Sequence, residues 1–119
     1  MFLLIFMTLV ACKSTEVLLF KAGKSTEQAR KHASIVVVGR VSNASFTRLG
    51  STELVDFICT LQVLETLKGI PKANSLTAYS QAKRQSKFPQ RGEVWLFAFN
   101  SSYDLLVALP DSPKNRLWF

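Results

Sequence analysis

With 119 residues the chain has room for a single domain, and two cysteines with one histidine are too few ligands for a structural zinc site. The composition therefore argues against a metal enzyme, and we expect neither a metal nor another cofactor. Fifteen lysines and arginines against eight acids give a net charge of +7, spread over the whole chain. This excess favours an anionic partner, and membrane headgroups and nucleic acid both qualify.

The first eleven residues, MFLLIFMTLVA, form an apolar run interrupted only by Thr8. As a helix the run would be about 16 Å long, well short of the roughly 30 Å hydrocarbon core of a bilayer, so it cannot span a membrane by itself. Its length is that of the apolar region of a signal peptide. No lysine or arginine precedes the run, whereas signal peptides normally start with a positive region, so a start upstream of Met1 stays open.

The run ends in Leu9-Val10-Ala11-Cys12, which resembles the lipobox of bacterial lipoproteins. In lipoproteins a diacylglyceryl group is attached to the cysteine sulfur, and the signal peptide is cut just before it. The resemblance implies a signal peptide over residues 1–11 and a mature protein that is anchored by lipid at Cys12, on the periplasmic or extracellular face of a bacterial membrane. Two acyl chains bury enough methylenes for a stable anchor. The alternative is an N-terminal strand or buried helix in which Cys12 is an ordinary apolar residue.

Residues 12–33 are expected to form a linker followed by a short helix. Residues 17–20 make an apolar patch that can pack back on the domain. Ser25 and Gln28 fit a capping box with Ser25 as N-cap, and residues 29–33 continue a two-turn helix with its cations at the negative C-terminal end. A short helix therefore leads into the first strand.

Runs of β-branched and aromatic residues separated by turn residues predict five strands, over residues 34–46, 52–67, 75–80, 93–99 and 103–109. Gly39 suggests a bulge that lets the long first strand serve both halves of a barrel. The third strand is edge-like. The fourth is apolar on both faces, so it is central or covered by another element. Pro110 and Pro113 end the fifth strand and leave a basic tail, whose last three residues we expect to pack against the barrel.

The second strand has the clearest alternation, and its apolar face is assigned to the core: Val55, Phe57, Cys59, Leu61 and Val63. This places Cys59 inward as a small hydrophobe and not as a redox or nucleophilic thiol. If Cys12 is lipidated, Cys59 has no intramolecular disulfide partner. A disulfide between Cys12 and Cys59 is the alternative, and it would exclude lipidation of that sulfur.

The segment 81–91, between the third and fourth strands, is polar and basic. Its four cations, Lys83, Arg84, Lys87 and Arg91, lie within nine residues with no acid between them. The simplest interpretation is a solvated loop or short helix. The same cations also suit a patch for phosphate-bearing headgroups, so they are the candidate anion-binding residues.

A long, glycine-interrupted first strand and a polar segment between strands three and four are what a five-stranded OB-fold barrel needs. Three segments also resemble netrin-like domains, which are related to the tissue inhibitors of metalloproteinases. They follow in the family's order: ASIVVVGRV from residue 33, LQVLETLKG from residue 61 and FPQRGEVWLFA from residue 88. The resemblance covers about residues 34–99 and implies a mainly β fold, an OB-fold-like Greek-key barrel over residues 34–119.

The chain differs from the inhibitory members of this family at the N-terminal residues with which those members inhibit metalloproteases. Those members chelate a protease zinc with the amino group and carbonyl of an N-terminal cysteine, within a Cys-x-Cys start. Cys12-Lys13-Ser14 lacks the second cysteine, and acylation would consume or crowd the chelating groups. Ser86 also stands near where the family carries a cysteine before its FxxGE segment. The resemblance therefore implies the fold, whereas metalloprotease inhibition is not expected to carry over.

The leading interpretation is a non-catalytic, lipid-anchored cell-envelope protein with an OB-type binding or assembly module, partnered by the membrane and by another envelope protein. The rival is a cytoplasmic OB-fold that binds single-stranded nucleic acid. It is less favoured because the loops are short and only Phe46 and Tyr79 suit base stacking. An enzyme is favoured least, since no carboxylate pair or activated nucleophile stands out and His32 ends a charged helix.

Overall fold

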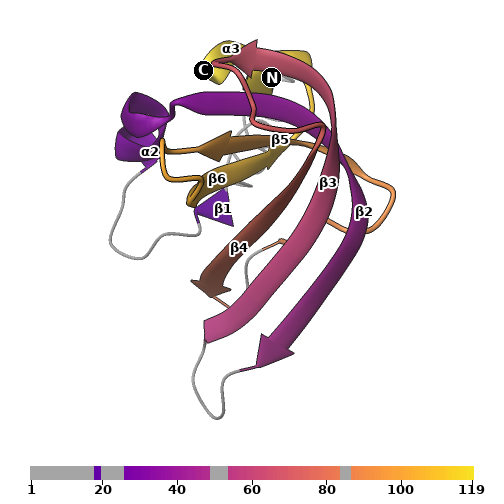
Figure 1. Ribbon diagram of the computed structural model, residues 1–119. Coiled ribbons are helices and arrows are strands. Elements are labelled where there is room, and N and C mark those ends of the chain that lie inside the picture. The colour runs from indigo at the N-terminus through magenta and orange to yellow at the C-terminus, as the bar shows by residue number, and fades with distance from the viewer. Residues whose placement is uncertain (1–17, 20–25, 49–53, 84–86) are drawn as a thin grey trace, which may run out of the picture.

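The computed structural model describes residues 18–19, 26–48, 54–83 and 87–119. These residues form one antiparallel sheet of six strands with two short helices (Figure 1). In chain order the elements are β1 (Leu18–Leu19), α2 (Thr26–His32), β2 (Ile35–Arg48), β3 (Leu54–Lys68), β4 (Ser75–Lys83), β5 (Val94–Phe99), β6 (Leu105–Pro110) and α3 (Pro113–Trp118).

The mainly β fold and all five predicted strands are confirmed, as β2 to β6. The boundaries differ by a few residues, and the largest difference is at β4, which continues to Lys83 into the segment predicted as a loop or helix. The predicted short helix is confirmed as α2, whose last turn carries its basic residues. Ser25, the predicted N-cap of this helix, lies outside the described residues.

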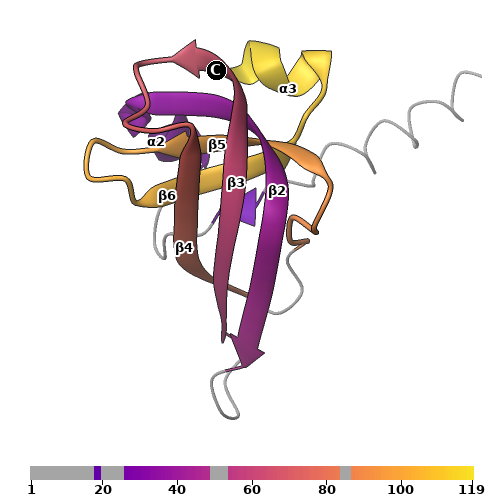
Figure 2. The same ribbon diagram turned by 45° about the vertical axis from the view of Figure 1, so that its right-hand side comes forward.

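The strands pair in the order β1-β6-β5-β2-β3-β4. β2 is the central strand: its first half pairs with β5, and nearly its whole length pairs with β3. Figure 2 shows β2, β3 and β4 running side by side, with β5 and β6 crossing behind them. The end strands of this order are β1 and β4, and the pairings of the described strands include none that closes the sheet into a barrel.

The predicted bulge in the first strand is confirmed. The register between β2 and β3 shifts between Val38 and Gly39, with further shifts on either side of this point. A Cβ on Gly39 would lie 2.5 Å from Cδ1 of Leu61, so a larger residue here would require the buried Leu61 side chain to shift. The bulge bends β2 so that one strand can serve both parts of the sheet.

Two apolar clusters fill the two faces of the sheet. The first includes Trp95, Phe97 and Phe99 of β5 together with the inward side chains of β2, β3 and β4. The second includes Leu96 and Ala98 of β5, and helices α2 and α3 cover it. The prediction that this strand is apolar on both faces because it is central and covered is therefore confirmed.

The predicted core face of the second strand is also confirmed. Val55, Phe57, Cys59 and Leu61 of β3 are buried, and Val63 is partly buried against the same cluster. The edge character of the third predicted strand holds as well, since β4 is the last strand of the sheet. Its inward side chains are buried and the alternate ones are exposed, as in a strand with one solvated face.

Both ends of the described chain contain elements that the sequence did not predict. The apolar patch at residues 17–20 contributes β1, in which Leu18 pairs with Ala108 of β6. The basic tail contains α3, where the Ser112 hydroxyl accepts a hydrogen bond of 3.0 Å from the Asn115 backbone N–H. Trp118 packs on the second cluster as expected, whereas the Leu117 side chain is 84% exposed.

Candidate functional site

The structure describes the side chains of two of the four predicted anion-binding residues. Lys87 and Arg91 are exposed in the connection between β4 and β5. Lys83 is the last residue of β4, but its side chain, like the whole of Arg84, lies outside the described residues. Cys12, the predicted lipidation site, lies outside them too. The proximity of all four cations therefore stays a prediction.

The described part of the β4–β5 connection, residues 87–93, is anchored by apolar residues, with Lys87 and Arg91 exposed. The Phe88 ring packs against Phe46 and Phe57, with centroid distances of 4.9 and 5.3 Å, and Pro89 is buried. The Glu93 carboxylate is engaged inside the connection, because its Oε1 accepts hydrogen bonds from the Gln90 backbone N–H and the Trp95 indole N–H. The connection thus forms a supported basic surface.

Sequence reasoning missed one residue beside this surface. Arg40 of β2 is exposed and pairs with Val94, and the Gly92 N–H donates a 2.7 Å hydrogen bond to the carbonyl of neighbouring Val41. Arg40 therefore lies next to the turn that carries Arg91. The two arginines are 51 positions apart in the sequence, so only the strand pairing reveals this neighbourhood.

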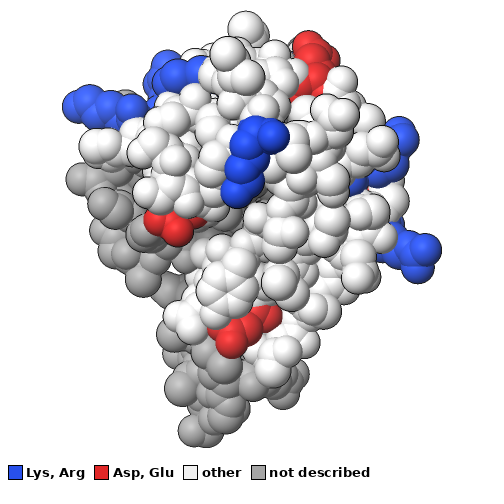
Figure 3. All heavy atoms as spheres, viewed as in Figure 1, with Lys and Arg blue, Asp and Glu red and all other residues white. Residues whose placement is uncertain are grey.

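A second basic surface, which the sequence did not predict, lies where α2, α3 and the end of β3 meet. Arg30 and Lys31 are exposed in the last turn of α2. Lys68, also exposed, pairs with Val36 at the start of β2. Figure 3 shows lysine and arginine side chains over α2 and the adjoining end of the sheet, at the upper left of the view.

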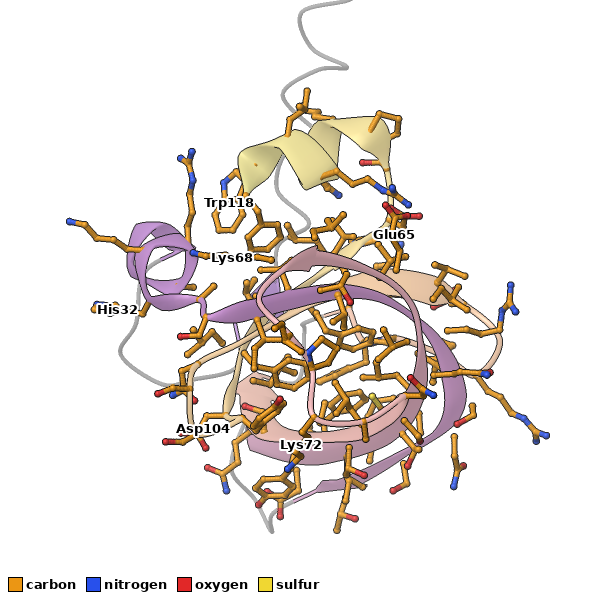
Figure 4. The ribbon with its side chains drawn as sticks, turned by 45° about the horizontal axis from the view of Figure 1, so that its top comes forward. His32, Glu65, Lys68, Lys72, Asp104 and Trp118 are labelled. Atoms are coloured by element: carbon orange, nitrogen blue, oxygen red, sulfur yellow. The ribbon has the colours of Figure 1, made fainter. Side chains whose placement is uncertain are left out.

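An aromatic side chain joins this second surface. The Arg30 guanidinium carbon lies 5.8 Å from the ring centroid of Trp118 in α3, within the range of a cation–π contact. Figure 4 shows Lys68 and Trp118 at the end of the molecule where both helices lie, while Lys72 and Asp104 lie away from it. We name Arg30, Lys31, Lys68, Leu117 and Trp118 the α2–α3 surface.

Ion pairs hold α3 in place beside this surface. Arg116 contacts Asp111 with an Nε–Oδ1 distance of 2.8 Å and Glu65 of β3 with an Nη1–Oε1 distance of 3.1 Å. The hydrogen bonds to Asp111 are the main reason that the pKa of Arg116 is raised. Arg116 pairs with two carboxylates, so these three groups together carry a net charge of −1 beside the three exposed cations Arg30, Lys31 and Lys68 of the α2–α3 surface.

The exposed face of β3 and β4 has a different character. The Tyr79 hydroxyl donates a 3.0 Å hydrogen bond to Asp56, and the Gln81 side chain donates one of 3.1 Å to the same carboxylate oxygen. The hydrogen bond to this carboxylate raises the pKa of Tyr79. Of the two predicted stacking residues, Phe46 packs on Phe57 and Tyr79 is held beside an acid. This face therefore offers a negative group where a phosphate backbone would need cations.

Cys59 is a free, buried thiol on the inner face of β3. Burial raises its pKa from 9.0 to about 12, so the thiol stays protonated at neutral pH and is inert. Its assignment as a small core residue is therefore confirmed. In this structure the Cys59 sulfur forms no disulfide.

We expect slow alkylation of Cys59 in the folded chain. In a full-length Cys12→Ser variant, which keeps a single thiol, iodoacetamide at pH 8 should modify Cys59 at least 100-fold more slowly than in urea, because reaction requires the domain to open. The folded pKa lies above the unfolded one, so stability should also fall as the pH rises from about 9 toward 12. Equal alkylation rates with and without urea, measured by mass, would show that Cys59 is accessible.

Neither a metal site nor a membrane-spanning helix is found among the described residues. Their histidine, cysteine and acidic side chains form no group of three that could hold a metal ion. None of their helices is long and apolar enough to cross a membrane. Neither a model of a known protein family nor a curated protein matches the chain. The basic surfaces and the N-terminal sequence are therefore the features that indicate a function.

Proposed function

We propose that this chain is a non-catalytic, lipid-anchored protein of the bacterial cell envelope, whose β-domain is an OB-type module that binds or assembles with another component. One observation carries the proposal. An apolar run of signal-peptide length ends in Leu9-Val10-Ala11-Cys12, and the first described strand begins at Leu18, only six residues later. A lipidated Cys12 would thus stand directly before the folded domain and would hold it close to the membrane.

The buried state of Cys59 supports the same assignment. With this thiol inert on the inner face of β3, the sulfur of Cys12 is the one that remains for a diacylglyceryl group. Two acyl chains give a stable anchor, and a basic domain adds attraction to anionic headgroups.

The strand order supports the OB-type part of the proposal. β2, β3 and β4 are consecutive neighbours, and β5 returns to pair with β2 on its other side. This arrangement, with the fourth strand beside the first, is the Greek-key order found in OB-folds. The strong bulge in β2 is the device by which one strand turns the corner of such a barrel.

Single-stranded nucleic acid is the weaker candidate partner. In OB-folds it binds the face of the second and third strands, and here that face carries Asp56 bonded to Tyr79. Its exposed aromatic is thus paired with a carboxylate, and the one described exposed cation of these two strands is Lys68, the last residue of β3. Metalloprotease inhibition also lacks support, since Cys12 would be acylated.

We expect Cys12→Ser to abolish membrane retention. When the full chain is expressed in a bacterium, the wild-type protein should begin at Cys12, carry added acyl mass and sediment with membranes, whereas Cys12→Ser should show none of these properties. Cys59→Ala is the matched control, because it removes the other cysteine and should leave acylation intact. The proposal fails if the wild-type chain is unmodified and still begins with the apolar run; intact mass and membrane fractionation decide.

A further inference from the structure

We propose that the α2–α3 surface is the face that the domain lays on an anionic lipid bilayer. The inference rests on the proposed lipid anchor and adds an orientation to it, with α2, α3 and the end of β3 toward the membrane. The β4–β5 connection, with its separate basic residues, lies on the opposite side of the molecule from α2 in both views (Figures 1 and 2).

The chemistry of the α2–α3 surface fits a phospholipid surface. Arg30, Lys31 and Lys68 supply three exposed positive charges, and each such residue near an anionic bilayer favours binding. Leu117 is an exposed apolar side chain that can enter the acyl boundary. The Trp118 ring lies beside Arg30 and follows Leu117 in the chain, and tryptophan is enriched at membrane interfaces. The cations of this surface are complementary to the headgroup phosphates, and the leucine and indole side chains are complementary to the hydrocarbon below them.

The path of the chain places the anchor nearer to the start of α3 than to α2. β1 is antiparallel to β6, and Leu18 pairs with Ala108, so the chain before Leu18 leads toward the Leu109 and Pro110 end of β6. α3 begins three residues after Pro110, at Pro113. The six residues from Cys12 to Leu18 span at most about 20 Å. An anchor at Cys12 would therefore hold the end of β6 where α3 begins close to the bilayer, whereas α2 leads into Ile35, which pairs with Phe99 at the other end of β5.

Binding of the unacylated chain to vesicles tests this surface separately from the anchor. The protein is the full chain with Cys12→Ser, and the probes are vesicles of mixed phosphatidylglycerol and phosphatidylcholine and vesicles of phosphatidylcholine alone. Neutralising three charges with Arg30→Gln, Lys31→Gln and Lys68→Gln should lower the partition coefficient for the anionic vesicles about 100-fold. Leu117→Ser, at an exposed position, should lower it about tenfold.

The matched control neutralises three exposed cations elsewhere, Arg40, Lys72 and Arg91, with the same change in net charge. This control should keep most of the binding. The apolar segment before residue 12 is common to all variants, so it cancels in the comparison. Trp95 is buried, so a blue shift of tryptophan emission on binding should report Trp118 at the interface. Unchanged thermal unfolding shows that each variant is folded.

The outcomes separate this inference from the proposed function. Equal losses in the two triple variants would show that net charge alone governs binding and would overturn the orientation, even if Cys12 is acylated. If the α2–α3 triple variant loses binding to a single-stranded oligonucleotide while its vesicle binding is unchanged, the surface binds nucleic acid and the proposed membrane orientation is overturned. Vesicle binding that depends on the α2–α3 surface supports it even if Cys12 proves unmodified, in which case only the anchor fails.

Discussion

Gly69→Ala is expected to destabilise the domain by about 3 kcal/mol. Gly69 follows β3 with φ of +73°, a conformation that costs an L-residue about 1–2 kcal/mol. A Cβ at this position would also meet the backbone carbonyl oxygen of Ser34 far inside van der Waals contact. A backbone atom cannot move aside as a side-chain tip can, so the crowding adds a cost of about 1–3 kcal/mol. Denaturant unfolding followed by tryptophan fluorescence measures the loss.

Gly92→Ala is the control for this prediction. Gly92 has φ of +90°, but no atom lies within 4 Å of a Cβ built there. It should therefore show only the conformational cost, about 1 kcal/mol. If the two alanine variants lose the same free energy of unfolding, the close approach between Gly69 and Ser34 does not contribute to stability.

Phe97→Ala should lower the free energy of unfolding by about 3–5 kcal/mol, the usual loss for a fully buried phenylalanine. Phe97 is 0% exposed and lies in β5, between Val37 of β2 and Ala108 of β6. Strands on both sides hold the backbone, so the cavity cannot collapse easily. Because a domain of this size is stable by about 5–15 kcal/mol, the variant should be close to unfolding at growth temperature.

Ile70→Ala provides the matched comparison, since this side chain is 88% exposed in the turn after β3. Its truncation should change stability by no more than about 0.5 kcal/mol. Thermal unfolding of both variants measures the contrast. A loss at Ile70 as large as that at Phe97 would indicate that Ile70 is covered in solution.

Local patterns predicted most of the fold. The alternation of β3, the two-sided apolar character of β5 and the bulge at Gly39 are each written in a few consecutive residues, so they could be recognised without the structure. The helix α3 was missed because Pro113 was interpreted as the end of a strand, although Ser112 before it is a good N-cap.

The candidate surfaces were harder to predict than the strands. Lys87 and Arg91 were predicted as anion-binding residues because they lie close in the sequence, and this role stays a prediction. Arg30, Lys68 and Trp118 come from three segments, and their meeting depends on how β2 pairs with β3 and on where α3 packs. Such long-range pairings are set by the whole sheet, and no short motif reports them.

The central position of β2 also has a consequence for how the chain folds. β2, β3 and β4 are joined in chain order, and so are β5 and β6, so each group needs only short loops to form. The ladder between β2 and β5 is different, because it pairs Ile35 with Phe99, 64 positions away. Closing so long a loop costs entropy before any contact compensates for it. We therefore expect this ladder to limit the rate at which the domain reaches its native state.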